Sequence, residues 1–204
     1  MTKKNEELRV IGICGSLREG SYTRMALAVA LEGARELGAE TEIVDLKTYN
    51  LVFNDGRDTP YPEGVQRLRA DIRRAQGIVI GTPEYHSGMS GVLKNALDLM
   101  GFKEFGGKML GLVGVSGGSM GAVNALNSLR AVGRSLHAWV VPEQVSIPEA
   151  WKLFTPDGQI QSNHYRQRLM EVGRQVARFA YLHSSQEIQT FLKLWEEAPS
   201  NPGG

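Results

Sequence analysis

The sequence predicts an α/β fold, a doubly wound three-layer sandwich in which helices cover both faces of a five-stranded parallel sheet. Two observations predict it. Short, nearly continuous apolar runs stand at residues 8–14, 41–46, 77–82, 109–115 and 137–141, and such runs are typical of strands buried on both faces. Segments with apolar residues at helical spacing separate them, and alternating strands and helices with right-handed crossovers form such a sheet.

The helices are expected at residues 22–37, 63–75, 88–100, 120–134 and 161–183, with a further helical piece at 185–197. Gly38 is a natural stop after the first helix. We expect Pro83 and Pro142 to end the third and fifth strands, and Trp139, within the fifth strand, to lie in the core.

The length of 204 residues favours one domain. We expect a flexible N-terminus at 1–7, the folded domain at 8–184, and a helical extension with a disordered tail at 185–204. The formal net charge is +1, which calls for neither nucleic acid nor an anionic membrane as a partner.

Cys14 is the single cysteine, so no intramolecular disulfide is possible and a reducing compartment fits best. The polar start of the chain does not resemble a signal peptide. No apolar run approaches the roughly 20 residues that span a bilayer. We therefore expect a cytoplasmic protein.

Ligands of such sheets bind beyond the carboxyl ends of the strands, at the point where the strand order reverses. The loop after the first strand carries the hydroxyls of Ser16, Ser21 and Thr23 and the guanidinium of Arg18 beside a helix N-terminus. This combination suits phosphate oxygens, although an N-cap serine followed by a surface arginine explains the loop equally well. Neither G-x-G-x-x-G nor the P-loop motif is present, so a monophosphate is favoured over a dinucleotide or a nucleoside triphosphate.

The loop after the third strand, residues 83–91, combines a proline and two glycines with Tyr85, which could flank a planar ring. An ordinary turn with an exposed aromatic residue is the alternative. His86 is the one histidine in these loops, and a lone loop histidine gives no ground for a catalytic role.

In the loop after the fourth strand, the adjacent Gly117 and Gly118 would let the backbone approach a ligand closely. A plain turn with Ser119 as an N-cap explains this loop alone. Three such loops, each after the appropriate strand, are less easily explained by chance. The histidines and Cys14 lack metal-ligand spacing, so we expect no metal, and we assign no catalytic side chain.

Three motifs carry a family resemblance: GSLREGSYTR at 15–24, PEYHSGMSGVLKNALD at 83–98 and VSGGSMGA at 115–122. The chain resembles the NAD(P)H-dependent FMN reductase family, which includes chromate, quinone and azo reductases, over residues 9–142. The resemblance implies a flavodoxin-like fold with strand order 2-1-3-4-5. It also implies FMN as cofactor, NADPH or NADH as co-substrate, and assembly into a homo-oligomer, a dimer or tetramer.

The resemblance places the FMN phosphate on the first motif and the ring and ribityl chain on the other two. Many members have Asn where this chain has Thr23, which still offers a hydroxyl. The implied cofactor-binding residues are Ser16, Arg18, Ser21, Tyr22, Thr23, Pro83, Glu84, Tyr85, His86, Ser87, Ser116, Gly117, Gly118 and Ser119.

The implied reaction is a ping-pong transfer of hydride from NAD(P)H, with electrons passed on to a small-molecule acceptor such as a quinone, an azo compound, chromate or free flavin. The first alternative is a flavodoxin-type electron carrier that docks on redox proteins; the small net charge argues against it, because such carriers present a surface of one charge sign. A non-redox module with the same fold and an arsenical or iron-linked flavoprotein also stay open.

Overall fold

Five parallel strands form the central sheet of the computed structural model, which describes residues 8–57 and 60–196. They lie in the order β2-β1-β3-β5-β6, and the short β4 pairs antiparallel with the end of β3. Counted without β4, this is the predicted order 2-1-3-4-5, so the flavodoxin-like α/β fold is confirmed. The strands are β1 (Arg9–Cys14), β2 (Glu40–Asp45), β3 (Gly77–Tyr85), β4 (Gly88–Met89), β5 (Met109–Val115) and β6 (Trp139–Ile147).

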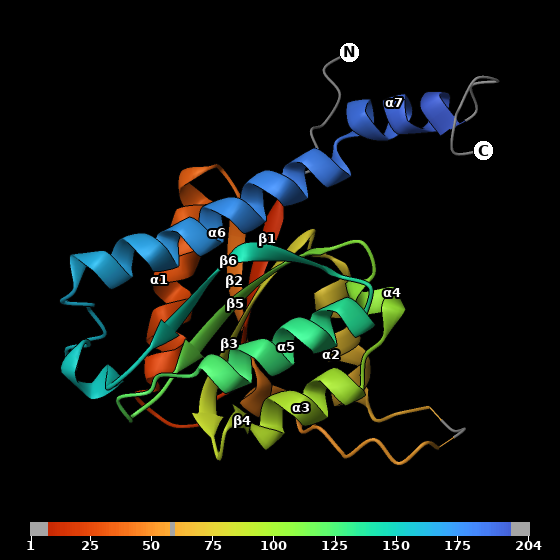
Figure 1. Ribbon diagram of the computed structural model, residues 1–204. Helices are drawn as coiled ribbons and strands as arrows, with labels where there is room; N and C mark the ends of the chain where they lie inside the picture. The colour runs from red at the N-terminus through yellow and green to blue at the C-terminus, as the bar shows by residue number, and fades with distance from the viewer. Residues whose placement is uncertain (1–7, 58–59, 197–204) are drawn as a thin grey trace.

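Helices cover both faces of the sheet (Figure 1). The helices α1 and α6 pack on one face, and α2, α3 and α5 pack on the other. The helices are α1 (Tyr22–Glu36), α2 (Glu63–Arg73), α3 (Gly91–Asp98), α4 (Phe102–Phe105), α5 (Val123–Ser135), α6 (Asn163–Ser184) and α7 (Gln186–Glu196), with 3-10 turns η1 (Leu46–Tyr49) and η2 (Ala150–Lys152).

Two glycines let α1 and α6 touch backbone to backbone. A Cβ on Gly173 would lie 1.8 Å from the Ala30 carbonyl oxygen, and a Cβ on Gly33 would lie 2.0 Å from that of Met170. Only hydrogen fits at either position. This contact fixes α1, and with it the loop that leads into α1, against the rest of the domain.

Both prolines expected to end strands lie inside them. β3 continues through Pro83 to Tyr85, and β6 continues through Pro142 to Ile147. Beyond Gly81, β3 pairs with β5 but no longer with β1. Pro142 lies on the edge strand β6, where the register with β5 shifts in a bulge. A proline is tolerated where its missing N–H has no ladder partner to satisfy, so the predicted stops were wrong for a positional reason.

The bounds of two helices also differ from the prediction. The helix expected at 88–100 is the β4 turn followed by α3 and, after Gly101, the separate α4. The helix expected from residue 120 begins at Val123, because Gly121 has a φ of 70° and breaks the helical path before it.

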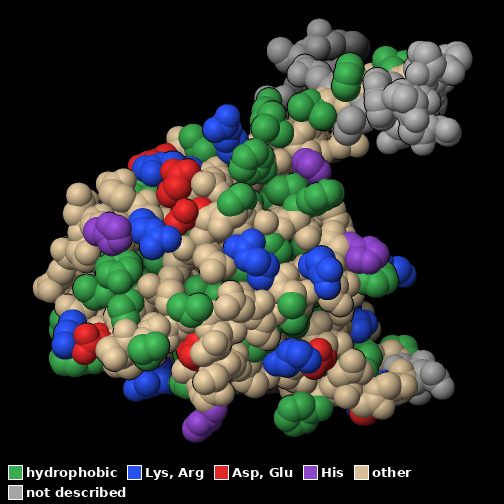
Figure 2. All heavy atoms as spheres, in the orientation of Figure 1, with side chains coloured by type: hydrophobic (Ala, Val, Ile, Leu, Met, Phe, Trp, Pro, Cys, Tyr) green, Lys and Arg blue, Asp and Glu red, His purple; other side chains and the backbone are tan. Residues whose placement is uncertain are grey.

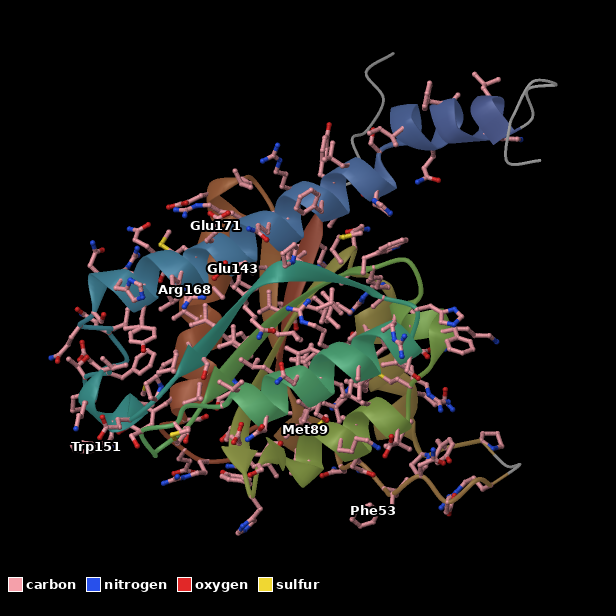
Figure 3. All side chains as sticks on the ribbon, in the orientation of Figure 1. Phe53, Met89, Glu143, Trp151, Arg168 and Glu171 are labelled. Carbon is pink, nitrogen blue, oxygen red and sulfur yellow. The ribbon has the colours of Figure 1, made fainter. Side chains whose placement is uncertain are left out.

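The edge strand β6 is held to α6 by charged side chains. Arg168 forms an ion pair with Glu143 at 2.7 Å and also donates to the Gln144 carbonyl at 2.9 Å. Gln175, about two turns further along α6, accepts from the Glu143 N–H at 3.4 Å. Figure 3 shows Arg168, Glu143 and Glu171 along this side of α6.

Trp139 was expected in the core, but 60% of it is exposed. It stands at the first residue of the edge strand, where the sheet has no further neighbour. At the same end of the domain, α6 extends past the sheet and leads into α7, which projects beyond the body of the domain (Figure 1). Figure 2 shows hydrophobic side chains gathered at this end of the molecule. The expectations for residues 1–7 and for the tail at 197–204 lie outside the described residues.

Candidate functional site

The strand order reverses between β1 and β3. The chain leaves β1 through α1 to reach β2 on one side, and the next strand, β3, lies on the other side of β1. The loops after β1, β3 and β5 therefore meet at one edge of the sheet, as ligand sites of open α/β sheets require. Gly15 lies at the centre: its N–H donates to the Gly81 carbonyl at 2.8 Å, and a Cβ on it would lie 2.9 Å from that oxygen.

Ser90 ties the first two loops together. Its hydroxyl donates to the Gly15 carbonyl at 2.5 Å and accepts from the Leu93 N–H at 3.2 Å as the N-cap of α3. Its own N–H donates to the Thr82 hydroxyl at 3.1 Å. Ser90 and Thr82 are both buried. The sequence analysis did not single out either residue, although a serine before the LKNALD segment is an N-cap signal.

The loop from residue 15 to 21 offers donors at the N-terminus of α1. Ser21 is the N-cap, and the Ser16 hydroxyl accepts from the Arg18 N–H at 3.4 Å. No hydrogen bond or ion pair joins the Arg18 guanidinium to any residue that the structure describes. Within the same part of the chain, the backbone N–H groups of Tyr22 and Thr23 also have no partner. Free N–H groups at a helix start, and a free guanidinium in the loop that precedes it, are groups that can bind an anion.

The side chains of two residues of this first motif pack against other parts of the domain. Thr23 is 2% exposed, and its methyl group faces Gly81, so it offers chiefly its backbone N–H. The ring of Tyr22 stacks on Phe154 with centroids 5.9 Å apart.

The loop after β3 is a tight hairpin into β4. Tyr85 pairs with Gly88, and the two residues between them, His86 and Ser87, have φ angles of 50° and 63°. Positive φ at both central positions is the type I′ turn, which normally carries Asn and Gly. Strain of this kind is concentrated at functional sites. The hairpin leaves Tyr85 about half exposed beside the buried Pro83.

The carboxylate of Glu84 faces α5. Its Oε2 accepts from the Ala125 N–H at 2.9 Å, while the Ser146 hydroxyl accepts from the Ala122 N–H at 2.7 Å. These two oxygens serve the first turn of α5, whose N-cap residue is an alanine. Glu84 thus fixes the third loop relative to the second. Its role in binding the cofactor stays a prediction.

The third loop is open on one side and buttressed on the other. A Cβ on Gly117 would meet nothing within 4 Å. The Ser116 hydroxyl accepts from the Gly118 N–H at 3.0 Å, and the exposed Ser119 follows. The segment after β6 supports the loop, because the Ala150 N–H donates to the Ser116 carbonyl at 3.0 Å.

That supporting segment, residues 148–162, was not assigned to the site from the sequence. It brings Phe154 against Tyr22, and its Trp151 is 57% exposed (Figure 3). The two aromatic residues Trp151 and Phe154, soon after the last strand, were the available signal in the sequence. The segment forms a wall between the first and third loops.

Comparison with known proteins agrees with this geometry. Residues 8–152 match the family model of NADPH-dependent FMN reductases. The chain is 34% identical over 172 residues to an NAD(P)H-dependent FMN reductase of Pseudomonas aeruginosa, covering 82% of this chain and 92% of that protein. The chain belongs to the NADPH-dependent FMN reductase family. It is an oxidoreductase, with FMN as its cofactor and NAD(P)H as its reductant.

Two further relatives support the membership. The chain is 38% identical over 157 residues to an NADPH azoreductase of a Bacillus species, covering 75% of this chain and 82% of that one. The structure of FerB, an NAD(P)H:acceptor oxidoreductase from Paracoccus denitrificans, superposes with a TM-score of 0.67 at 25% identity, covering 86% of this chain and 98% of that one. The predicted family is confirmed.

The residues present fit FMN. The unpartnered guanidinium of Arg18 and the free N–H groups of Tyr22 and Thr23 suit the dianionic phosphate. The side-chain-free backbone at Gly117, with no obstruction nearby, leaves room for a flat ring.

Cys14 lies directly below these loops but is buried. Burial raises the pKa of its thiol, against smaller opposing effects from the Ser16 backbone and Arg24. A protonated, buried thiol is unreactive. Among residues 8–57 and 60–196, no cluster of His, Cys, Asp and Glu could hold a metal ion. None of the helices within those ranges has the length and apolar character needed to cross a bilayer.

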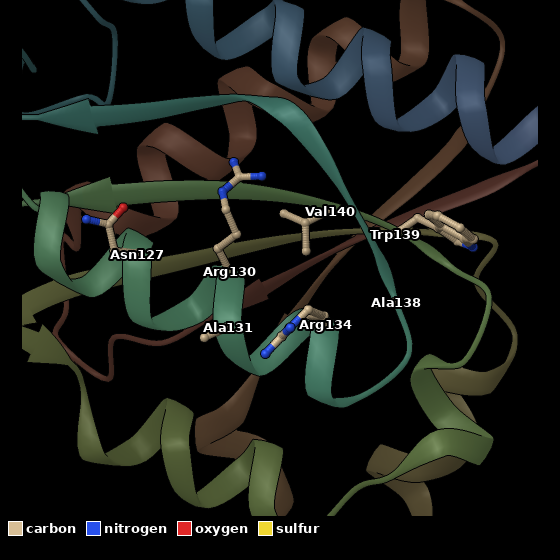
Figure 4. A pocket seen from close by; sticks show the side chains of 7 residues that line it. All are labelled: Asn127, Arg130, Ala131, Arg134, Ala138, Trp139 and Val140. Atoms are coloured by element: carbon tan, nitrogen blue, oxygen red, sulfur yellow. The ribbon is translucent and has the colours of Figure 1, made fainter.

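A hollow of about 430 Å³ lies away from the loops, between α5 and the start of β6 (Figure 4). Arg134 and Trp139 stand at it, and Arg130 is anchored there by the Gln144 side chain at 2.8 Å and the Val141 carbonyl at 3.2 Å. None of its lining residues belongs to the loops after β1, β3 and β5.

Proposed function

We propose that this protein is a cytoplasmic NAD(P)H-dependent reductase that binds FMN across the loops after β1, β3 and β5 and reduces small acceptors such as quinones, azo compounds, chromate or free flavin. The observation that carries the proposal is the meeting, at the strand-order reversal, of an unpartnered arginine, free helix N–H groups and an unobstructed glycine loop. The relatives named FMN reductase and azoreductase support it.

The first loop binds the phosphate. Arg18 pairs with it, Ser16 and Ser21 donate hydroxyls, and the N-terminus of α1 at Tyr22 and Thr23 adds backbone donors and the helix dipole. Charge-assisted bonds of this kind are the strong ones.

The other two loops hold the ring. Pro83, Tyr85, His86 and Ser87 present a rigid hairpin to one side of it, and Glu84 keeps that hairpin in register with α5. The backbone from Ser116 to Ser119 would also border the ring, since Gly117 and Gly118 permit close approach. FMN held by these residues would supply the redox chemistry between NAD(P)H and the acceptor, so the protein binds and orients it and no side chain has to serve as a nucleophile.

We propose a ping-pong order, in which the nicotinamide and the acceptor use the same opening in turn. The exposed Tyr85 and Trp151 are the aromatic surfaces placed to border that opening. A homo-oligomer, dimer or tetramer, is part of the proposal because the family resemblance implies one. The electron-carrier alternative is disfavoured by the net charge of +1.

The test is an absorbance spectrum of the purified protein before and after anaerobic NADPH, followed by a quinone or an azo dye. The proposal expects flavin bands that bleach and then return with the acceptor. Initial rates at varied NADPH and acceptor should give parallel double-reciprocal lines. A protein that neither carries FMN nor takes it up contradicts the proposal, and bound flavin that neither NADPH nor NADH bleaches supports the electron carrier.

A second experiment tests the phosphate loop alone. Arg18→Ala should weaken FMN binding by at least about tenfold, because charge-assisted bonds contribute about 1.5–3 kcal/mol, and should leave the affinity for riboflavin, which lacks the phosphate, unchanged. Arg178→Ala, an exposed arginine of α6, is the matched control and should change neither. An equal loss for both flavins would place Arg18 away from the phosphate.

A further inference from the structure

The hollow between α5 and β6 is lined by positive charge that no carboxylate balances. Arg130 and Arg134 of α5 line it, and each of its other lining residues is neutral (Figure 4). Helix α5 carries no acidic residue along its length. The single carboxylate of β6, on Glu143, is paired with Arg168 at 2.7 Å. The hollow is therefore a local concentration of positive charge on a chain whose net charge is only +1.

The guanidinium of Arg134 has nothing to pair with. Within residues 8–57 and 60–196, no hydrogen bond or ion pair joins it to another residue. Arg134 lies one helical turn after Arg130, so both side chains stand on the same face of α5. Like charges at this spacing destabilise a helix. An anion bound between the two guanidinium groups would offset that repulsion.

Arg130 is held in place without being neutralised. Its Nη1 donates to the Val141 carbonyl at 3.2 Å, and its Nη2 donates to the Pro142 carbonyl at 3.4 Å and to the Gln144 side chain at 2.8 Å. All three acceptors are uncharged, so the positive charge stays available to a ligand. A side chain that is already ordered loses less conformational entropy on binding.

The short turn from α5 to β6 fixes Arg134 relative to Trp139. The His137 N–H donates to the Arg134 carbonyl at 3.0 Å, and the Trp139 N–H donates to the Lys108 carbonyl at 2.8 Å. The His137 ring stacks on Phe102, with centroids 4.3 Å apart and planes inclined by 18°. The cation and the indole therefore belong to one ordered turn at the same end of the hollow.

Trp139 supplies an aromatic surface beside the charge. It lines the hollow and is 60% exposed, although the ring of His183 packs edge-on against it at 5.8 Å. An exposed indole at the first residue of an edge strand adds little to the core. The bases of nucleic acids and nucleotides stack on such surfaces.

The combination of groups indicates the class of ligand. Two guanidinium groups match the charge of a phosphate monoester dianion, and their planar forks match its oxygens. The volume of about 430 Å³ lies within the range of about 300–1,000 Å³ that is typical of small-molecule sites. We propose that the hollow binds a nucleoside phosphate, with the phosphate on Arg130 and Arg134 and the base stacked on Trp139.

This site is separate from the flavin loops and does not depend on the proposed acceptors. Two sources can supply the same chemistry: a free nucleotide, or the adenosine 2′-phosphate of NADPH. NADH lacks that phosphate, so a comparison of the two reductants distinguishes the sources.

Equilibrium dialysis of the full chain against AMP, at low salt and with FMN in excess, tests the proposal. Arg134→Gln should weaken AMP binding by at least about tenfold, because it removes charge-assisted bonds, and Trp139→Ala by at least about fivefold, because it removes the stack. Adenosine, which lacks the phosphate, should bind more weakly than AMP and should not respond to Arg134→Gln.

Arg178→Gln is the matched control. Arg178 is an exposed arginine of α6 that, like Arg134, has no carboxylate partner among the described residues, and it does not line the hollow. This variant should bind AMP as the wild type does. Thermal unfolding and FMN content show whether each variant is folded.

A wild type that takes up no AMP at millimolar concentration overturns the proposal. So does AMP binding that folded Arg134→Gln and Trp139→Ala variants retain in full, or that Arg178→Gln weakens equally. If Arg134→Gln raises the KM for NADPH but not for NADH, the ligand is the 2′-phosphate of the reductant; if AMP binding is lost and both KM values stay, the ligand is a free nucleotide. Bound flavin that NADPH fails to bleach would count against the proposed reaction alone, because the dialysis does not depend on turnover.

Discussion

Removing the Ser90 hydroxyl should damage both the fold and the flavin site. This one group donates to the Gly15 carbonyl at 2.5 Å, in the loop after β1, and accepts from the Leu93 N–H at 3.2 Å, in the first turn of α3. Ser90 is 4% exposed, so water cannot easily replace either bond. Ser90→Ala therefore removes two bonds from the point at which the first two loops meet.

The magnitude follows from the two bonds. Loss of an N-cap costs about 1 kcal/mol, and a buried carbonyl left without its donor costs about 1–3 kcal/mol. We expect the free energy of unfolding of the apo protein to fall by about 2–4 kcal/mol. We also expect FMN affinity to fall by about tenfold, equivalent to about 1.4 kcal/mol, because the phosphate loop loses its anchor at Gly15.

Urea unfolding of the apo protein and fluorescence titration with FMN measure the two effects. Ser162→Ala is the matched control, since Ser162 caps α6 through a single bond to the Tyr165 N–H at 3.4 Å and has no link to the flavin loops. It should cost about 1 kcal/mol and leave FMN affinity unchanged. If Ser90→Ala costs no more than Ser162→Ala, or leaves FMN affinity unchanged, the argument that Ser90 joins the two loops is refuted.

Three further predictions concern other parts of the chain. Because burial raises the pKa of the Cys14 thiol, its reaction with a disulfide reagent at pH 8 should be at least about tenfold slower in the folded protein than in urea. The same pKa shift makes a contribution to the free energy of unfolding that is fully present below the thiol pKa of the unfolded chain and is lost as the pH rises through the thiol pKa of the folded protein. Fast labelling of Cys14 in the folded protein would contradict this prediction. Gly173→Ala should lower the free energy of unfolding by about 1–3 kcal/mol or more, because its Cβ would meet the Ala30 carbonyl at 1.8 Å, whereas Gly91→Ala, where a Cβ meets nothing within 4 Å, should not destabilise; equal effects would refute the close helix contact. Ser87→Gly should raise the free energy of unfolding by about 1 kcal/mol, since glycine relieves the φ of 63° at the turn, and a lower melting temperature would show that Ser87 makes a compensating contact.

The sequence predicted the fold well where a strand is central. β5 lies at 109–115, as expected, because it is buried on both faces and its apolar run is continuous. The errors lie at the edge and at the ends of strands. The errors at Pro142 and Trp139 have one cause, which is that β6 has a single neighbouring strand. An edge strand tolerates a proline and leaves its first side chain in solvent. Which strand lies at the edge depends on long-range pairing, which periodicity does not encode.

The candidate site, too, could be predicted only in part. The loops after β1, β3 and β5 could be placed from the sequence because the fold class fixes where strand ends meet. The contacts between the loops could not, since they join residues distant in sequence: Ser90 with Gly15, and Glu84 with Ala125. Glu84 was predicted to line the cofactor, and the structure adds that its carboxylate accepts from the Ala125 N–H at the start of α5. Whether its backbone also contacts the cofactor remains a prediction.

The two ends of the sheet place different demands on the same chain. At the carboxyl ends of the strands, free donors and strained turns hold the loops open to a ligand, and the close contact of α1 and α6 at Gly33 and Gly173 supports them. At the amino ends, α6 leaves that contact and carries its apolar residues past the sheet into α7. A single helix thus supports the loop that leads into α1 with its first half and carries exposed apolar side chains, Phe179 and Leu182, near its end.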